Sequence, residues 1–99
     1  MALILDLDNT LIHAHPVPRE PAVIPGDMFH VVLRQGARED HHLVQRRHQL
    51  QEFLQEAAKI FQLSVYTHGL RKYAEGIVNN IDPDGQYFGH RIVSWYEQC

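Results

Sequence analysis

The segment LILDLDNTLIHA, residues 3–14, brings two carboxylates and a hydroxyl directly after an apolar run. If the segment is extended, the side chains of Asp6 and Asp8 point the same way. A carboxylate placed there can attack phosphorus and form an aspartyl phosphate, which divides a difficult hydrolysis into two easier steps. A second carboxyl group would protonate the leaving oxygen and later activate water. The competing interpretation is a polar turn after a buried strand, with Thr10 as a cap.

A second short apolar stretch, Leu63–Tyr66, ends in Thr67 just before a helical pattern. The Thr67 hydroxyl there could hold a phosphate oxygen beside free backbone N–H groups, or it could simply cap the helix. Phosphoryl chemistry at this site would also need a divalent cation, and Mg²⁺ prefers hard oxygen ligands. The Asp-x-Asp-x-Thr pattern alone arises often by chance, but the second strand ending in threonine makes the chemical interpretation much stronger.

The spacing of apolar residues indicates an α/β fold. Short apolar stretches alternate with two helical patterns, so we expect a mostly parallel sheet with ligands beyond the carboxyl ends of its strands. The 2–7 segment is expected to be a strand covered on both faces. Residues 15–27 contain four prolines and are expected to form a loop. The expected strands are 2–7, 28–34, 41–45, 63–66 and 88–95, and the expected helices are 49–61 and 70–81.

The bulk properties describe one small domain. Ninety-nine residues with a formal charge of −3 and scattered basic residues give no case for a direct nucleic-acid partner. No apolar stretch approaches the roughly 20 residues that span a bilayer, so we expect no membrane partner. The single cysteine, Cys99, excludes an internal disulfide framework. The oligomeric state is left open.

Three stretches of the chain resemble a known family. They are LDLDNTLIHA, LSVYTHGLRKYAEGIVNNIDPDGQYFGHRI and VSWYEQC, and together they cover roughly half of the sequence. They are similar to the carboxyl-terminal-domain phosphatases of RNA polymerase II, a branch of the haloacid dehalogenase superfamily. The resemblance implies a Rossmann-like three-layer sandwich that is incomplete at its carboxyl terminus. Residues 1–99 would form the amino-terminal part of the phosphatase domain, with a proline-rich insert around 15–27.

The resemblance also implies roles for individual residues. Asp6 would be the nucleophile and Asp8 the general acid and base, with Mg²⁺ on the Asp6 carboxylate and the Asp8 backbone carbonyl. Thr67 would bind phosphate. Thr10 would belong to the same substrate-binding group and would steady the loop that follows the first strand. Arg47 aligns with the arginine of an Arg-Pro-Gly element and would have a structural or phosphate-facing role, although His48 and Gln49 replace its proline and glycine.

The remaining candidates are histidines and aromatic residues. His68 follows Thr67 and either contacts substrate or is an exposed loop residue. His13 matches the family motif and is interpreted as a structural hydrogen-bonding residue, whereas His41 and His42 are expected to be solvated. Tyr73 is assigned to the core.

The function implied is a Mg²⁺-dependent protein serine/threonine phosphatase that acts through an aspartyl phosphate. Its substrate would be a phosphorylated protein, namely the polymerase carboxyl-terminal domain, which implies a nuclear location, with the cytoplasm as the alternative. In the family a lysine and a distal acidic residue lie further along than Cys99, so two alternatives stay open. The chain is then either a fragment of an enzyme or a non-catalytic phosphate- or partner-binding relative. A small phosphorylated metabolite is a third possible substrate class.

Overall fold

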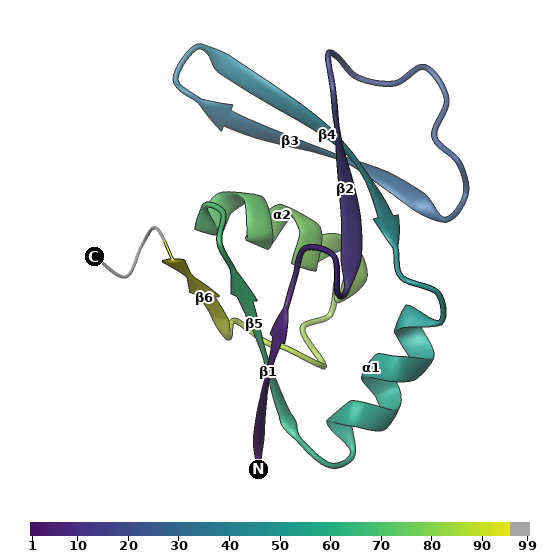
Figure 1. Ribbon diagram of the computed structural model, residues 1–99, viewed down its shortest axis with the longest axis vertical. Helices are drawn as coiled ribbons and strands as arrows, with labels where there is room; N and C mark the ends of the chain where they lie inside the picture. Colours follow the sequence, from purple (N-terminus) through teal and green to yellow (C-terminus); the bar gives the residue numbers. More distant parts are fainter. Residues whose placement is uncertain (96–99) are drawn as a thin grey trace.

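Two small sheets and two helices make up the fold in the computed structural model, which describes residues 1–95 (Figure 1). Strands β1, β5 and β6 form a parallel sheet in the order β1-β5-β6, and strands β2, β4 and β3 form an antiparallel sheet in the order β2-β4-β3. The elements in chain order are β1 (Ala2–Asp6), β2 (Ile12–Val17), β3 (Met28–Gln35), β4 (Arg38–Arg46), α1 (Leu50–Ala58), β5 (Gln62–Thr67), α2 (Arg71–Ile81) and β6 (Ile92–Ser94). Cys99 lies outside the described residues.

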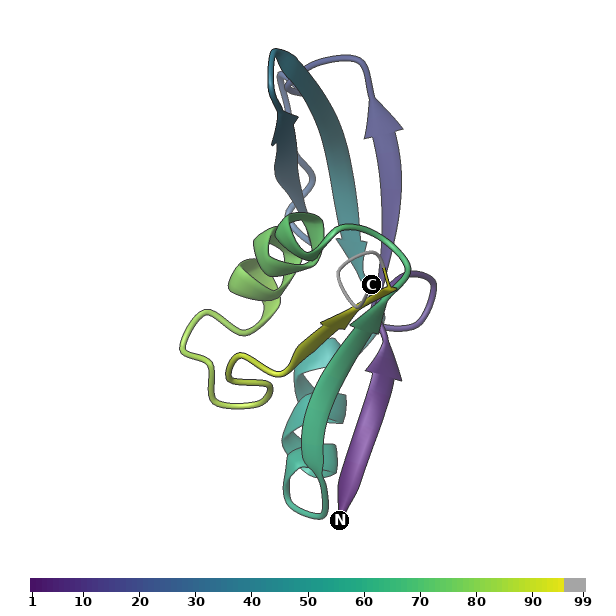
Figure 2. The same ribbon diagram turned by 90° about the vertical axis from the view of Figure 1, so that its left-hand side faces the viewer.

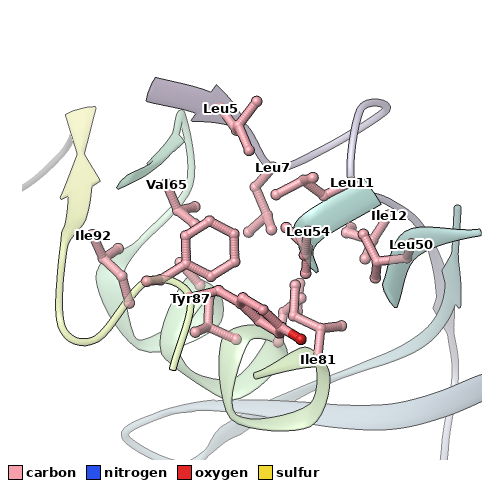
Figure 3. Packing of buried hydrophobic residues seen from close by; sticks show 14 of the residues in the cluster. Leu5, Leu7, Leu11, Ile12, Leu50, Leu54, Val65, Ile81, Tyr87 and Ile92 are labelled. Carbon is pink, nitrogen blue, oxygen red and sulfur yellow. The ribbon is translucent and has the colours of Figure 1, made fainter. Parts of the chain in front are cut away.

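The parallel sheet buries one face. Leu5 pairs in register with Val65, and Val65 with Ile92, and all three belong to the hydrophobic core (Figure 3). Both helices contribute to the same core, so they lie on this face of the sheet. Ile4 points to the opposite face and is 64% exposed. The prediction of a strand covered on both faces is therefore wrong for β1, because the described residues supply one helical layer of the expected sandwich.

The prediction of a loop over residues 15–27 is only partly correct. The strand β2 extends through Pro16 to Val17, and only residues 18–27 form the connecting loop. Because β2 is an edge strand of the antiparallel sheet, it tolerates a residue that lacks a backbone N–H. Its partner β4 begins at Arg38, earlier than predicted, after a turn in which Gly36 has a φ of 63°.

The last strand is shorter than predicted. Residues 82–91 form a compact loop, and only Ile92–Ser94 joins the sheet. The buried Asp82 carboxylate organises this loop by accepting the backbone N–H groups of Tyr87 and Phe88, the latter at 2.9 Å. Phe88 is completely buried as a result, and the chain turns at Gly89 with a φ of 59° before it enters β6.

Helix α2 connects the two sheets. It contacts β6 of the parallel sheet and β3 of the antiparallel sheet. The turned view shows it beside the hairpin that β3 and β4 form (Figure 2). A Cβ atom at Gly76 would lie only 3.1 Å from the Val31 side chain. The glycine therefore permits the close approach of α2 to β3.

Core packing leads to a first prediction. Leu54 of α1 is completely buried in the core that the helices share with the parallel sheet and the first loop (Figure 3). We expect Leu54→Ala to lower the free energy of unfolding by about 2–5 kcal/mol, through lost burial and the cavity left behind. Urea unfolding followed by circular dichroism measures this. The matched control is Ile60→Ala, since Ile60 is 67% exposed and its truncation should change stability by less than about 0.5 kcal/mol. Equal losses in the two variants would contradict the assigned packing.

Candidate active site

The carboxyl ends of β1 and β5 lie next to each other, as the sequence predicted. Asp6 is in register with Tyr66, and the Leu7 backbone N–H donates to the Tyr66 carbonyl at 3.0 Å. Both strands point toward the same edge of the sheet (Figure 1). This edge therefore brings Asp6 close to Thr67, although β2, β3, β4 and α1 all lie between β1 and β5 in the chain.

The loop after β1 is anchored by two apolar side chains. Leu7 and Leu11 are completely buried, and the Leu11 N–H donates to the Leu7 carbonyl at 3.0 Å. Between them Asn9 adopts a left-handed conformation with a φ of 64°, and its N–H donates to the Ile12 carbonyl at 2.8 Å. The polar residues of the loop are thereby held in place by the core beneath them.

Asp8 is held by a residue that the sequence pattern assigned to the core. The Tyr73 hydroxyl, from the first turn of α2, donates to Asp8 Oδ1 at 2.8 Å across 65 positions of sequence. Burial, followed by the hydrogen bond to Asp8 and its negative charge, raises the pKa of Tyr73. Tyr73 therefore stays protonated and remains a donor throughout the ordinary pH range. The only sequence signal for this contact is a tyrosine early in the helix that follows Thr67.

Thr67 and His68 lie at the end of β5 in different surroundings. Thr67 is completely buried, and its Oγ1 accepts the Gly69 backbone N–H at 3.0 Å. A Cβ atom at Gly69 would lie 3.3 Å from the Tyr73 ring, so the turn favours a glycine at this close approach. His68 is exposed, with its ring edge-on to Tyr66 at 5.2 Å between centroids.

Thr10 and Arg47 are brought together at a neighbouring place. Both line a hollow of about 310 Å³ beside the loop, together with His13 and Arg46. His13 Nδ1 lies 2.9 Å from Asn9 Oδ1, in agreement with its interpretation as a hydrogen-bonding residue. The candidate residues thus divide into the sheet-edge group of Asp6, Asp8, Thr67 and His68, and the pair that lines this hollow.

Two histidines expected in solvent are partly buried instead. The His41 side chain is only 15% exposed, and its Nδ1 lies 2.9 Å from His30 Nε2. The His42 ring packs edge-on against Tyr73 at 5.1 Å, and its Nδ1 is buried without a partner among the described residues. The expectation failed because β4 is the central strand of its sheet. The two histidines, Tyr73, Leu70 and Pro16 contribute to a cleft of about 570 Å³.

Comparisons with known proteins agree with this arrangement. The family model described as NLI interacting factor-like phosphatase matches residues 1–99. The chain is 36% identical to the human phosphatase of the RNA polymerase II C-terminal domain over 94 residues, which cover 95% of this chain and 10% of that protein. It is 32% identical to the phosphatase of the same name from Schizosaccharomyces pombe, covering 95% of this chain and 15% of that protein.

A solved structure matches as well. It is the fission yeast RNA polymerase II CTD phosphatase Fcp1, in a variant bound to beryllium fluoride, with a TM-score of 0.84 and 30% identity over 97% of this chain and 30% of that chain. The chain thus spans a small part of the length of these relatives. The match confirms the α/β, haloacid-dehalogenase-like fold with its parallel sheet. Together these findings place the chain in the NLI interacting factor-like phosphatase family.

Proposed function

We propose that this chain carries the nucleophile and the acid/base residue of a protein serine/threonine phosphatase. The observation that carries the proposal is the Asp8 carboxylate, fixed by Tyr73 at 2.8 Å in a loop that follows the exposed Asp6. Paired carboxylates in distinct surroundings suit distinct roles. The family membership supports phosphate as the group acted on.

The reaction has two steps at these residues. An Asp6 carboxylate oxygen attacks phosphorus, the bond from phosphorus to the serine oxygen breaks, and that oxygen takes a proton from Asp8. In the second step Asp8 removes a proton from water, the water oxygen attacks phosphorus, and the bond to Asp6 breaks. Since Tyr73 occupies Oδ1 of Asp8, it leaves Oδ2 as the oxygen that carries the proton.

The donor set fits Mg²⁺. The exposed Asp6 carboxylate and the Asp8 backbone carbonyl are hard oxygen ligands, and Mg²⁺ commonly binds through one or two carboxylates plus waters and substrate phosphate. Among residues 1–95 no group of three histidine, cysteine or acidic side chains is placed to hold a metal. When bound, Mg²⁺ would neutralise the negative charges on the nucleophile and on the phosphate.

Thr67 and His68 are the proposed phosphate contacts at this edge. A hydroxyl that accepts one hydrogen bond, as Thr67 does from Gly69, keeps its own proton to donate to a phosphate oxygen. His68 is exposed beside it. The similar Fcp1 structure holds beryllium fluoride, a chemical analogue of a phosphoryl group, and this supports a phosphate site in the fold.

The proposed substrate is a phosphorylated protein segment. The relatives are named as phosphatases of the RNA polymerase II carboxyl-terminal domain, which supports that substrate and a nuclear location. The cleft of about 570 Å³ beside Tyr73 suits a peptide flanking the phosphate better than an enclosed metabolite.

Within residues 1–95, no helix has the length and apolar character needed to cross a membrane. We further propose that residues 1–99 form part of a phosphatase domain that includes the segment 15–27.

Substitution of the two carboxylates tests the proposal. Asp6→Asn should abolish phosphate release from a phosphoserine peptide, because an amide cannot form the acyl phosphate. Asp8→Asn should slow release by about 10² or more, the usual worth of general acid–base catalysis. The control Asp84→Asn changes an exposed carboxylate in the loop after α2 and should leave the rate unchanged.

Phosphate release is measured with Mg²⁺ and again after chelation with EDTA, which should stop it. Mg²⁺-dependent release that survives in Asp6→Asn would contradict the nucleophile assignment. A folded chain with no release at all would contradict catalysis by this chain and favour a phosphate-binding module.

The Tyr73 contact leads to a separate prediction. Tyr73→Phe keeps the ring but removes the hydrogen bond to Asp8 Oδ1, so the acid is positioned less well. We expect kcat/KM to fall by about tenfold on a phosphoserine peptide, whose poor leaving group needs the acid. The fall should be much smaller on an aryl phosphate, whose leaving group needs little protonation. Tyr66→Phe is the matched control, and equal losses on both substrates in Tyr73→Phe would indicate a general structural effect.

A further inference from the structure

The hollow lined by Thr10 and Arg47 has an unusual concentration of positive charge. Its volume is about 310 Å³, and Arg46, Arg47 and His13 line it together with polar groups of the first loop. Its lining, within the part of the chain that the structure describes, contains no acidic residue. The hollow therefore favours an anion over a cation or an apolar group.

The two guanidinium groups are held in place by aromatic rings. The Arg46 guanidinium lies 4.7 Å from the ring centroid of the buried Phe29, and that of Arg47 lies 4.5 Å from the ring of Phe53. Stacking of this kind limits the conformations of an arginine while leaving its N–H groups available. Less ordering is then needed when an anion binds.

The positive charges of these two arginines have no acidic partner within ion-pair distance in the part of the chain that the structure describes. Among residues 1–95, neither Arg46 nor Arg47 forms an ion pair. Some other cations do form ion pairs, in Arg34–Glu39, Arg38–Asp40 and Lys59–Glu56. Although the chain has a formal charge of −3, the lining of this hollow is positively charged.

An adjoining hollow shows where the positive region ends. It shares Arg46 and Arg47 but also includes Asp27 and Glu52. Gln45 Nε2 donates to Asp27 Oδ2 at 3.4 Å. The carboxylates thus lie on the α1 side, and an anion would be better placed on the side of Thr10.

The hollow adjoins the loop after β1, which carries Asp8, Asn9 and Thr10. The Arg47 backbone N–H donates to the Leu11 carbonyl at 3.0 Å, and Asn9 and Thr10 belong to both the loop and the lining. The site proposed at Asp6 and this hollow therefore belong to one connected part of the molecule. A single extended peptide, at about 3.3–3.6 Å per residue, can reach both if its two anionic groups are suitably spaced.

We propose that this hollow binds the phosphate of a second phosphoserine in a multiply phosphorylated peptide whose first phosphate is at Asp6. The proposal rests on the proposed function, since it takes a phosphorylated peptide as the ligand. Arginine suits this role because its planar N–H groups match the oxygens of a phosphate. The chain would thus bind a densely phosphorylated segment in preference to one with an isolated phosphate.

Peptide binding tests this without requiring turnover. The 99-residue chain with Asp6→Asn is titrated into fluorescein-labelled peptides, and fluorescence anisotropy gives the Kd. Each peptide carries one phosphoserine, and a second position about two to five residues away holds serine, glutamate or phosphoserine. We expect the second phosphate to lower Kd by about tenfold at low salt, with a smaller gain at high salt because exposed charges are screened.

Variants then assign the effect to the hollow. Arg46→Gln combined with Arg47→Gln should remove the gain from the second phosphate, while the corresponding change of both arginines to lysine should keep part of it. Lys59→Gln, in an exposed ion pair beside α1, should keep it all. Circular dichroism confirms that each variant is folded.

The outcomes separate this proposal from the proposed function. If the second phosphate brings no gain, or if the gain survives Arg46→Gln with Arg47→Gln, the subsite is overturned. A gain equal for glutamate and phosphoserine overturns the assignment to phosphate. If the gain depends on the arginines but the wild-type chain with Mg²⁺ releases no phosphate, the subsite stands and catalysis by this chain fails.

Discussion

The packing of α2 between the two sheets is the constraint on which the candidate site depends. One side of the helix contributes Ile77 and Ile81 to the core under the parallel sheet, while Gly76 lets the backbone approach Val31 of β3. This double contact fixes both the position of the helix and its rotation about its own axis. Tyr73 is thereby directed at Asp8, and a rotation of the helix would separate the two.

The site combines buried and exposed parts with different purposes. Leu7 and Leu11 fix the backbone of the first loop from below, and Asp82 does the same for the loop before β6 by accepting two backbone N–H groups. Among the groups proposed to react or bind, Asp6 and His68 are exposed and Asp8 is half-buried, whereas Thr67 is buried. This division lets a small domain hold polar side chains in defined positions while substrate can still reach them.

Regular patterns in the sequence allowed much of this arrangement to be predicted. The apolar spacing placed both helices within a few residues, and the alternation of strands and helices predicted the parallel sheet and the meeting of Asp6 with Thr67. The extent of β2 could not be predicted, because tolerance of Pro16 depends on the strand being at an edge. The hydrogen bond from Tyr73 to Asp8 was also missed, since it depends on the rotation of α2, and the partial burial of His41 depends on β4 being central.

The connectivity of the two sheets has a consequence for the order of folding. Strands β3 and β4 are joined by a turn at residues 36–37, so their contacts are local and close only a short loop. The contact between Tyr73 and Asp8 spans 65 positions, and β1 must find β5 across the whole hairpin and α1. Loop closure over longer separations is slower and costs more chain entropy. The hairpin of β3 and β4 is thus expected to form early. Asp6 and Asp8 reach their final positions only when the chain has completed its most distant contacts.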